Sequence, residues 1–204
     1  ALLRLYEFLD EYRERVGLSF RANLKFNGIR EEDIRRLAEA GAAGLTVMVE
    51  SADEGERRGL FNKPVSDAHI FQVAEWLHQH DVNFGSSVFF GLPGDTFDDH
   101  IHRIPFFREI NPLYLYTTFF QPYPGLKILD DPVIQASLPE GRDFDSTVHQ
   151  SIHLRVEDRV RLTNLKKVYF LMVRFPILER PLKRLCRYRV PLLFDALFMT
   201  HFAW

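Results

Sequence analysis

Apolar side chains follow two alternating periods along the first 126 residues of the chain. Spacings of three to four residues, typical of a helix with one buried face, alternate with short apolar runs typical of buried strands. The helical pattern covers residues 2–15, 29–41, 66–77 and 96–109, and strands are expected to start near residues 20, 45, 84 and 114. This alternation predicts parallel strands joined by right-handed helical connections.

Local signals mark where several of these helices begin and end. Ser66 is expected to cap one helix, and Thr96 with Asp99 three residues later has the spacing of a capping box. Gly41 is expected to end the helix that precedes it, and Pro105 is expected to kink the helix that follows Thr96.

The carboxyl ends of the strands carry the candidate chemistry. Four parallel strands fit either a doubly wound sheet or part of a barrel, and both folds place their functional edge at these ends. The strand ends read Asn27-Gly28, Glu50-Ser51, Gly91-Leu92-Pro93-Gly94-Asp95 and Gln121-Pro122-Tyr123. We therefore expect an α/β fold with its site at this edge.

The alternation stops after residue 126. Residues 127–154 are rich in loop-forming residues, and residues 155–175 and 182–202 are expected to form two apolar helices separated by Pro176 and Pro181. The predicted organisation is an α/β part over 1–126, a connector over 127–154 and a basic, apolar helical extension over 155–204.

The composition is that of a globular protein, with 46% hydrophobic and 26% charged residues. No apolar run reaches the roughly 18 residues of a membrane span, and the N-terminal residues lack the pattern of a signal peptide. Cys186 is the single cysteine, which excludes a disulfide within the chain and a cluster built from its own cysteines. A reducing, cytoplasmic setting is expected.

Charge is distributed unevenly along the chain. Residues 162–204 contain eight Lys and Arg residues and two acids, whereas the remainder has 18 basic and 26 acidic residues. The basic, apolar extension is expected either to pack on the α/β part as a helical cap or to contact a membrane surface. The aromatic strand ends (Phe89, Phe90, Tyr114, Tyr116, Phe119 and Phe120) and this basic segment are separate parts of the chain, which argues against nucleic-acid binding.

The stretch "SSVFFGLPGDT", residues 86–96, joins an apolar strand to a helix start. Its two glycines, Gly91 and Gly94, match neither of the common phosphate-binding spacings, and Pro93 removes a backbone N–H from the turn. Such a bare turn favours the close approach of a flat group over the binding of phosphate.

Glu50 ends an otherwise apolar strand, so its carboxylate is expected at the rim of the sheet. At that place a carboxylate can accept hydrogen bonds from sugar hydroxyls or from an ammonium group. It can equally form a structural ion pair with Lys63, and the sequence leaves both alternatives open.

The histidines lack the spacing of a metal site. His78/His80 and His100/His102 are two residues apart on expected helices, about 200° around the axis, and are expected to be solvated or capping. The stretch "HQSIH", residues 149–153, has helical spacing but has Gln where HExxH motifs have their glutamate. No GxSxG motif occurs, so a nucleophilic hydrolase is not indicated.

Three stretches together resemble a known family: "NLKFNGIREEDIRRLAEAGAAGLTVMVESADEGERRGLFNK", "VFFGLPGDTFDDHI" and "NPLYLYTTFFQPYPG". Over about residues 15–126 the chain resembles the second half of a radical S-adenosylmethionine (SAM) enzyme, of the branch often fused to a cobalamin-binding domain. The resemblance implies a partial (β/α) TIM-like barrel with parallel strands, followed by a C-terminal helical extension.

The family pattern has an Arg in strand three, a GIESG-like end to strand four, a Lys after a short helix, and GLPGET after strand five. The corresponding residues here are Arg21, Glu50-Ser51-Ala52, Lys63 and Gly91-Leu92-Pro93-Gly94-Asp95-Thr96. In such enzymes the turn after strand five lies along the adenine of SAM, and the acid that ends strand four meets its ribose. The implied cofactor-binding residues are Arg21, Glu50, Ser51, Phe89, Gly91, Leu92, Pro93 and Gly94.

The cofactors implied by the resemblance are SAM, a [4Fe–4S] cluster and, in this branch, cobalamin. The CxxxCxxC motif that holds the cluster in this family is absent from the chain. Cluster ligands are therefore expected from a missing N-terminal half or from a partner subunit. These 204 residues carry no assigned metal ligand or catalytic residue and are not expected to be active alone.

Three functions fit these observations. The first is part of a radical SAM oxidoreductase or methyltransferase, in which the chain supplies the adenine and ribose side of the site for C–H activation or methyl transfer on a small molecule. The second is a non-catalytic binding or assembly module whose basic tail docks on a partner or on a membrane surface. The third is an unrelated α/β-barrel enzyme that uses Glu50 and Lys63 as acid and base.

Overall fold

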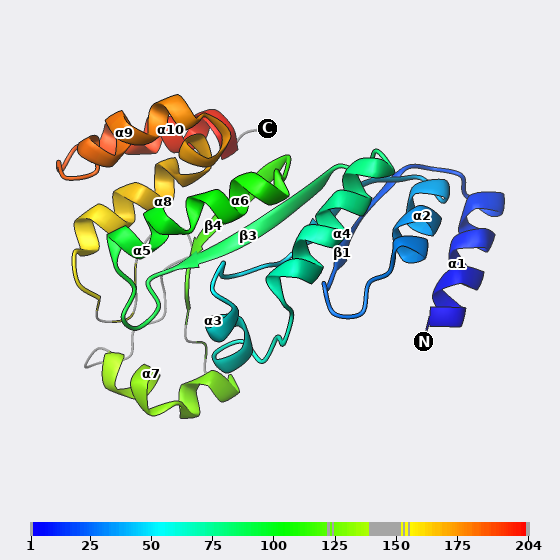
Figure 1. Cartoon of the computed structure of the whole chain (residues 1–204), viewed down its shortest axis with the longest axis horizontal. Coiled ribbons are helices and arrows are strands. Elements are labelled where there is room, and N and C mark those ends of the chain that lie inside the picture. Colours follow the sequence, from blue (N-terminus) through cyan, green and yellow to red (C-terminus); the bar gives the residue numbers. More distant parts are fainter. Residues whose placement is uncertain are drawn as a thin grey trace. The chain divides into compact units, whose positions relative to one another are not determined.

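The computed structural model describes residues 2–121, 123, 125–138, 152, 154 and 156–202 (Figure 1). Its first elements in chain order are α1 Leu2–Arg15, β1 Phe20–Leu24, α2 Glu31–Glu39, β2 Ala42–Val47, α3 Glu54–Gly59, α4 Asp67–Gln79 and β3 Phe84–Phe90. They are followed by α5 Phe97–His102, α6 Ile104–Ile110, β4 Tyr114–Phe119, the 3₁₀ turn η1 Lys127–Asp130, α7 Pro132–Ser137, α8 Arg159–Arg174, α9 Pro176–Leu185 and α10 Pro191–Phe202.

The strands form one four-stranded sheet in the order β1-β2-β3-β4. β1 pairs with β2 in parallel, with Leu24 opposite Val47, and β2 pairs with β3 in parallel, with Leu45 opposite Phe84. The spatial order follows the chain order without a reversal, as in a (β/α) barrel and unlike a doubly wound sheet. The α/β class, the parallel strands of a partial TIM-like barrel and the helical C-terminal part are thus confirmed.

The chain divides into two compact units. Unit 1 comprises Ala1–Ser87 and Glu109–Leu115, and unit 2 comprises Val88–Arg108 and Tyr116–Trp204. Each unit has its own buried apolar side chains. Those of unit 1 include Ile34, Leu37, Leu45, Val47, Ile70, Val73, Leu77 and Phe84, and those of unit 2 include Val88, Phe90, Phe107, Phe119, Leu165, Tyr169, Met172 and Phe194. The boundaries predicted at residues 126 and 154 stay a prediction, because residues 139–151 lie outside the described part.

A glycine in unit 1 makes room for an aromatic ring across the sheet. A Cβ on Gly85 of β3 would lie only 1.9 Å from the ring of Tyr114. Because Gly85 has no side chain, the ring reaches over β3, and the hydroxyl of Tyr114 lies 2.8 Å from Oγ1 of Thr46 on β2. A hydrogen bond therefore ties the start of β4 to β2.

The expected helix starts are observed. Oγ of Ser66 accepts from the backbone N–H of His69 at the start of α4, and Thr96 forms a capping box with Asp99 at the start of α5. The helix expected over 96–109 is interrupted more strongly than by a kink. It ends at His102, and α6 begins at Ile104 with Pro105 in its first turn, where a missing N–H costs little.

The prediction of one helix over 182–202, set off by Pro181, is wrong. Pro181 lies inside α9, and the chain breaks instead between α9 and α10. At this break the side-chain amide of Asn164 on α8 donates to the backbone carbonyls of Cys186 and Tyr188, both at 3.0 Å. These bonds satisfy carbonyl groups at the end of α9 that would otherwise lack partners. A contact with a residue more than 20 positions away therefore sets the break.

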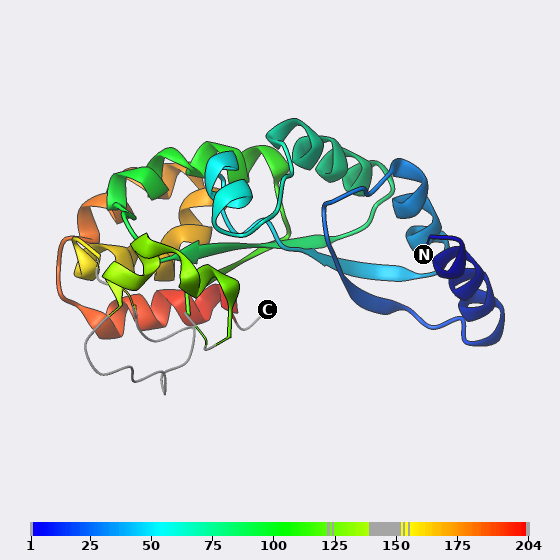
Figure 2. The same cartoon turned by 90° about the horizontal axis from the view of Figure 1, so that it is seen from below.

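In unit 2, α9 and α10 both pack on α8 (Figures 1 and 2). Lys166 of α8 is fully buried, with Nζ 5.2 Å from the ring centre of Phe119 and 4.4 Å from that of Phe198. Burial lowers the pKa of this lysine to about 8. The ammonium thus lies between rings from β4 and α10 and links them through cation–π contacts.

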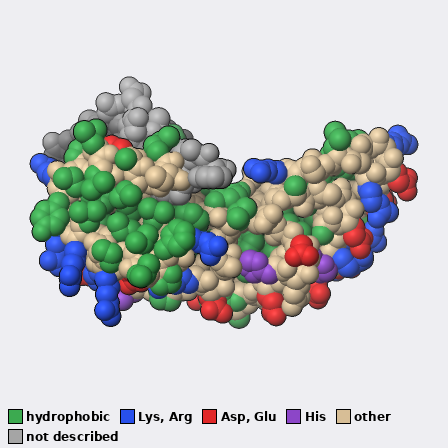
Figure 3. Space-filling model, turned by 90° about the horizontal axis from the view of Figure 1, so that it is seen from above, with side chains coloured by type: hydrophobic (Ala, Val, Ile, Leu, Met, Phe, Trp, Pro, Cys, Tyr) green, Lys and Arg blue, Asp and Glu red, His purple; other side chains and the backbone are tan. Residues whose placement is uncertain are grey.

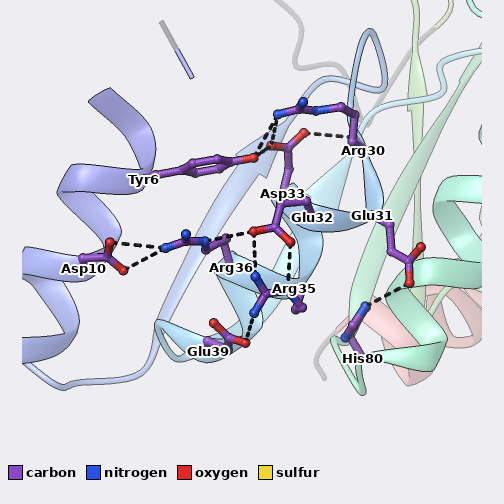
Figure 4. Close-up of polar contacts among 10 residues, drawn as sticks. All are labelled: Tyr6, Asp10, Arg30, Glu31, Glu32, Asp33, Arg35, Arg36, Glu39 and His80. Atoms are coloured by element: carbon purple, nitrogen blue, oxygen red, sulfur yellow. Dashed lines mark hydrogen bonds and ion pairs between the residues drawn. The ribbon is translucent and has the colours of Figure 1, made fainter. Parts of the chain in front are cut away.

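In unit 1, polar contacts attach α1 to α2 (Figure 4). The hydroxyl of Tyr6 donates to Oδ1 of the buried Asp33, and Oδ2 of Asp33 accepts from the backbone N–H of Arg30 at 2.9 Å. One turn along, Nη1 of Arg36 lies 3.1 Å from Oδ1 of Asp10. Burial raises the pKa of Asp33, but the bonds from Tyr6 and Arg30 outweigh burial and hold it below its usual value.

Removing the hydroxyl of Tyr6 should loosen α1. A typical hydrogen bond contributes about 1 kcal/mol, so Tyr6→Phe should speed amide exchange across residues 2–15 roughly fivefold at pH 7. The lowered pKa of Asp33 places this stabilisation above about pH 4, and it should be lost as the pH falls further through that pKa. Hydrogen–deuterium exchange measures both effects. Tyr12→Phe is the matched control, because no hydrogen bond of the Tyr12 hydroxyl occurs within the described residues, and equal exchange in the two variants would contradict the prediction.

Candidate functional site

Unit 1 contains a cavity of about 400 Å³ at the carboxyl ends of β1 and β2. One wall is formed by residues at or just after the ends of these two strands, and the other by α3, the loop after it and α4. The lining residues are Asn23, Leu24, Lys25, Phe26, Asn27, Met48, Val49, Arg57, Phe61, Asn62, Lys63, Val65 and Ile70. The cavity thus lies at the edge where (β/α) folds bind their ligands.

Glu50 follows Val49 of this wall and has an unusual environment. Its backbone has a positive φ of 69°, which is uncommon for a residue with a Cβ. Strained backbone conformations of this kind cluster at functional sites. Its side chain is 13% exposed, and Oε1 lies 2.7 Å from Nζ of Lys63, a residue of the cavity wall. The other oxygen, Oε2, is buried and has no hydrogen-bond partner among the described residues.

These facts bear on both alternatives for Glu50. The ion pair with Lys63 is present, so the structural role is real. It uses only one carboxylate oxygen, however, and a buried oxygen without a partner costs free energy. A donor group that reached this oxygen would remove the cost. Besides their ion pair, the two side chains retain one acceptor on Glu50 and the remaining N–H donors of Lys63, which lines the cavity.

The loop that carries Glu50 and Lys63 is organised by one buried side chain. Arg57 of α3 is 1% exposed, and its guanidinium donates to the carbonyl of Ser51 at 2.9 Å and to that of Val65 at 3.1 and 3.2 Å. The same group forms an ion pair with Asp67, the first residue of α4. Arg57 thereby connects the segment after β2, the loop after α3 and the start of α4.

None of the three site residues predicted in unit 1, Arg21, Glu50 and Ser51, is among the residues that line the cavity. The hydroxyl of Ser51 is already used, because it donates to Glu56 at 2.5 Å and accepts from the backbone N–H of Asp53 at 3.0 Å. Arg21 is exposed on β1, with its side chain beside Gly44. Asn23 is two residues further along the same face and does line the cavity.

The remaining predicted site residues belong to the turn of unit 2. Gly91 and Gly94 have positive φ angles of 80° and 78°, which explains the glycines. Gly91 and Leu92 are buried, and a Cβ on Gly91 would lie 2.8 Å from Cγ2 of Ile152. Pro93 is half-buried and Gly94 is exposed, so the turn is accessible at these two residues.

Phe89 of unit 2 is half-buried, with its ring edge-on to that of Phe120 at 6.0 Å. Its predicted contact with adenine stays a prediction, as does the predicted contact of the Gly91–Gly94 turn. The predicted sharing of one ligand between Glu50 and this turn also stays a prediction, since the two belong to different units.

The side chain of Asp95 hydrogen-bonds the backbone of this turn on its buried side. Its carboxylate is 1% exposed and accepts from the backbone N–H of Leu92 and from Nε2 of His100, both at 3.0 Å. Nη1 of Arg103 lies 3.5 Å from its other oxygen. Because Asp95 occupies the N–H of Leu92, that N–H is not offered to an anion, in agreement with a turn that does not bind phosphate.

The expectation that His100 is solvated or capping is wrong. His100 is fully buried, stacks on Phe90 at 3.9 Å and lies edge-on to Tyr169. His78 bonds the carbonyl of Ile110 at 3.1 Å, while His149 and His153 lie outside the described residues. The spacing of His100 and His102 did not reveal the burial of His100, because that burial depends on Phe90 of β3 and Tyr169 of α8. Its carboxylate partner, Asp95, lies only five residues away, in the turn before α5.

The described residues contain no group of three or more His, Cys, Asp and Glu side chains that could hold a metal ion. Cys186 is buried, and burial raises the pKa of its thiol to about 12, so it does not present a thiolate. The residues of this chain therefore do not fit a [4Fe–4S] cluster, which needs several thiolate ligands. Among the helices that the structure describes, none has the length and apolar character needed to cross a bilayer.

No protein-family model matches the chain, and no curated protein matches it. Among solved structures, the chain is similar to TsrM, a radical S-adenosylmethionine methyltransferase from Kitasatospora setae. With tryptophan and a SAM analogue (aza-SAM) bound, TsrM matches with a TM-score of 0.49 and 15% identity, over 57% of this chain and 23% of that one. With cobalamin and a [4Fe-4S] cluster bound, it matches with a TM-score of 0.48 and 12% identity, over 90% of this chain and 48% of that one.

The chain thus spans less than half the length of these TsrM chains. At this level of similarity the likeness carries no argument about the function of the chain, which has to be argued from its own residues.

Replacing Arg57 should destabilise unit 1. Arg57→Met removes a buried guanidinium and leaves the carbonyls of Ser51 and Val65 without their donor, so the free energy of unfolding should fall by about 3 kcal/mol. Arg58→Met is the matched control, because Arg58 is 67% exposed and its one ion pair within the described residues is with Glu54 of the same helix. It should cost about 0.5 kcal/mol or less. Urea denaturation followed by circular dichroism measures both, and equal losses would contradict the role of Arg57.

Replacing Asp95 should destabilise unit 2. Asp95→Asn keeps an acceptor for Leu92 but removes the charge that faces His100 and Arg103, so about 2 kcal/mol of stability should be lost. Asp98→Asn is the control, because Asp98 is 63% exposed and pairs with Lys183 at 3.3 Å. Thermal unfolding compares the two variants, and an unchanged melting temperature for Asp95→Asn would show that this carboxylate does not anchor the turn.

Proposed function

We propose that this chain supplies the SAM-binding side of a radical SAM enzyme, with the ribose of SAM held at the unit 1 cavity by Glu50. The observation that carries the proposal is the buried Oε2 of Glu50, which has no partner among the described residues while Oε1 is held by Lys63. A ribose has two neighbouring hydroxyl donors, and a carboxylate at the end of a (β/α) strand is well suited to accept from them.

The cavity fits the proposed ligand in size and chemistry. Its volume of about 400 Å³ lies within the usual range of small-molecule sites, and its wall combines apolar side chains with a few polar groups. Lys63 is 29% exposed in this wall, and its ammonium retains donors for the carboxylate of the methionine part of SAM. The adenine contacts of Phe89, Gly91, Leu92, Pro93 and Gly94, and the roles of Arg21 and Ser51, are carried over from the sequence resemblance as part of the proposal.

The chemistry of a radical SAM enzyme also requires a [4Fe–4S] cluster, which reduces bound SAM. The residues of this chain do not fit the cluster, so its ligands belong, in this proposal, to a further segment or subunit. The chain's own residues bind and orient the nucleoside, and C–H activation or methyl transfer on a small molecule is the proposed outcome of the assembled enzyme.

A nucleoside comparison tests the role of Glu50. The ligand 5′-deoxyadenosine carries the ribose hydroxyls of SAM and needs no cluster, whereas 2′,3′,5′-trideoxyadenosine lacks these hydroxyls. Glu50→Gln should weaken binding of 5′-deoxyadenosine to the whole chain at least tenfold, as expected for a charge-assisted hydrogen bond, and should leave the weaker binding of the trideoxy analogue unchanged. Titration calorimetry or ligand-observed NMR measures these affinities.

Glu75→Gln is the matched control, because Glu75 is exposed on α4 of the same unit and, in the part of the chain that the structure describes, bonds only Gln72 and Gln79 of that helix. Equal binding of the two nucleosides by the unmodified protein would contradict the ribose contact. If neither nucleoside binds but Glu50→Gln and Lys63→Met each abolish an activity that needs no metal, the acid–base function of this pair is supported instead.

A second test concerns the cluster. Anaerobic reconstitution of the complete gene product, or of this chain with its partner subunit, should yield the absorption of a [4Fe–4S] cluster whose loss follows mutation of cysteines outside these 204 residues. A complete gene product that binds no iron would overturn the radical SAM assignment while leaving the nucleoside result standing.

A further inference from the structure

The helices α9 and α10 present a large apolar surface to solvent. The strongly exposed apolar side chains between residues 174 and 199 are Phe175, Ile177, Tyr188, Val190, Leu192, Leu193 and Met199. Leu192 and Ile177 are each 84% exposed, and Leu192 and Met199 are seven residues apart on the same face of α10. In Figure 3, hydrophobic side chains gather over the part of unit 2 that holds these helices. A solvent-exposed apolar patch of this kind marks an interaction site.

The charges beside this surface are almost all positive. Arg174, Arg180, Arg184, Arg187 and Arg189 are exposed, and none of them forms an ion pair within the described residues. The two acids of the same segment are already engaged, because Glu179 pairs with Arg108 and Asp195 pairs with Lys167. Figure 3 shows Lys and Arg side chains grouped at the edge of the hydrophobic area.

We propose that α9 and α10 dock this protein on a membrane surface that contains anionic lipids. Apolar side chains of such helices enter the boundary between headgroups and acyl chains, while arginines extend to the phosphates. Tyr188 lies at the joint between the two helices, and tyrosine is enriched at this boundary. With 10 and 12 residues, α9 and α10 are much shorter than the about 20 residues of a spanning helix, so they lie on the membrane.

Charge favours lipid over a second copy of the chain docked through the same patch. A second copy of the chain docked through the same patch would place the five arginines of each copy against those of the other. Both acids of the segment are occupied within unit 2, so a second copy offers no compensating charge there. An anionic lipid layer supplies negative charge along the whole edge of the patch together with an apolar interior. This inference is independent of the proposed SAM site in unit 1.

Vesicle co-sedimentation of the whole chain tests the inference. The protein should sediment with vesicles of phosphatidylcholine and phosphatidylglycerol at low salt, bind vesicles of phosphatidylcholine alone at least tenfold more weakly, and be released as the salt concentration rises. The charge variant Arg180→Gln/Arg184→Gln/Arg187→Gln and the apolar variant Ile177→Ser/Leu192→Ser should each lower the partition coefficient at least tenfold. Both variants replace exposed residues, so their circular dichroism and melting temperature should match those of the unmodified protein.

Matched controls lie in unit 1. Arg13→Gln/Arg15→Gln replaces exposed cations of α1, and Leu113→Ser replaces an apolar residue that is 61% exposed. Neither should change vesicle binding. The inference is overturned if the unmodified protein fails to sediment with anionic vesicles, or if the charge and apolar variants bind as well as the controls. It is equally overturned if the patch variants abolish a dimer seen by analytical ultracentrifugation while vesicle binding is absent, because the occupant would then be a second copy.

Discussion

The buried guanidinium of Arg57 holds together the segment on which the candidate site of unit 1 depends. It donates hydrogen bonds to the carbonyls of Ser51 and Val65 and forms an ion pair with Asp67. Three segments between the end of β2 and the start of α4 are thus bound to one planar group. A buried charge is tolerated only when its donors are satisfied, and here they are satisfied by backbone oxygens and one acid. The loop that bears Glu50 and Lys63 is therefore tethered at both ends.

Unit 2 uses the opposite arrangement for its own turn. The buried carboxylate of Asp95 accepts hydrogen bonds from Leu92 and His100 and forms an ion pair with Arg103, whereas the buried cation of unit 1 donates to backbone carbonyls. Both anchors bond segments that follow a strand of the sheet, the segment of Ser51 after β2 and the turn of Leu92 after β3, where backbone groups need new partners. Each unit thus stabilises its strand-end loop with one charged group placed out of solvent.

The two sites proposed for ligands, the unit 1 cavity and the α9 and α10 surface, differ in chemical character. Next to the wall of the unit 1 cavity, Glu50 has one buried acceptor without a partner among the described residues, which favours a small ligand with hydroxyl or ammonium donors. The α9 and α10 surface of unit 2 has exposed apolar side chains beside arginines that form no ion pair within the described residues, which favours a broad anionic surface. A buried polar atom favours a ligand with one well-placed hydrogen-bond donor, whereas an exposed apolar area beside charged side chains favours an extended surface such as a lipid layer. The two proposals accordingly concern ligands of very different size.

The sequence by itself determined the α/β class, the strand positions and the helix starts at Ser66 and Thr96, because periodicity and capping act within a few residues along the chain. It raised an ion pair between Glu50 and Lys63 as one of two alternatives, and the structure contains that pair. It gave no reason to choose Arg57 over its neighbour Arg58 as the buried residue, and it did not show that His100 is enclosed or that Asn164 sets the end of α9. Whether a side chain is buried, and which polar group it bonds, depends on segments that are distant in the sequence. Only the folded chain brings those segments together.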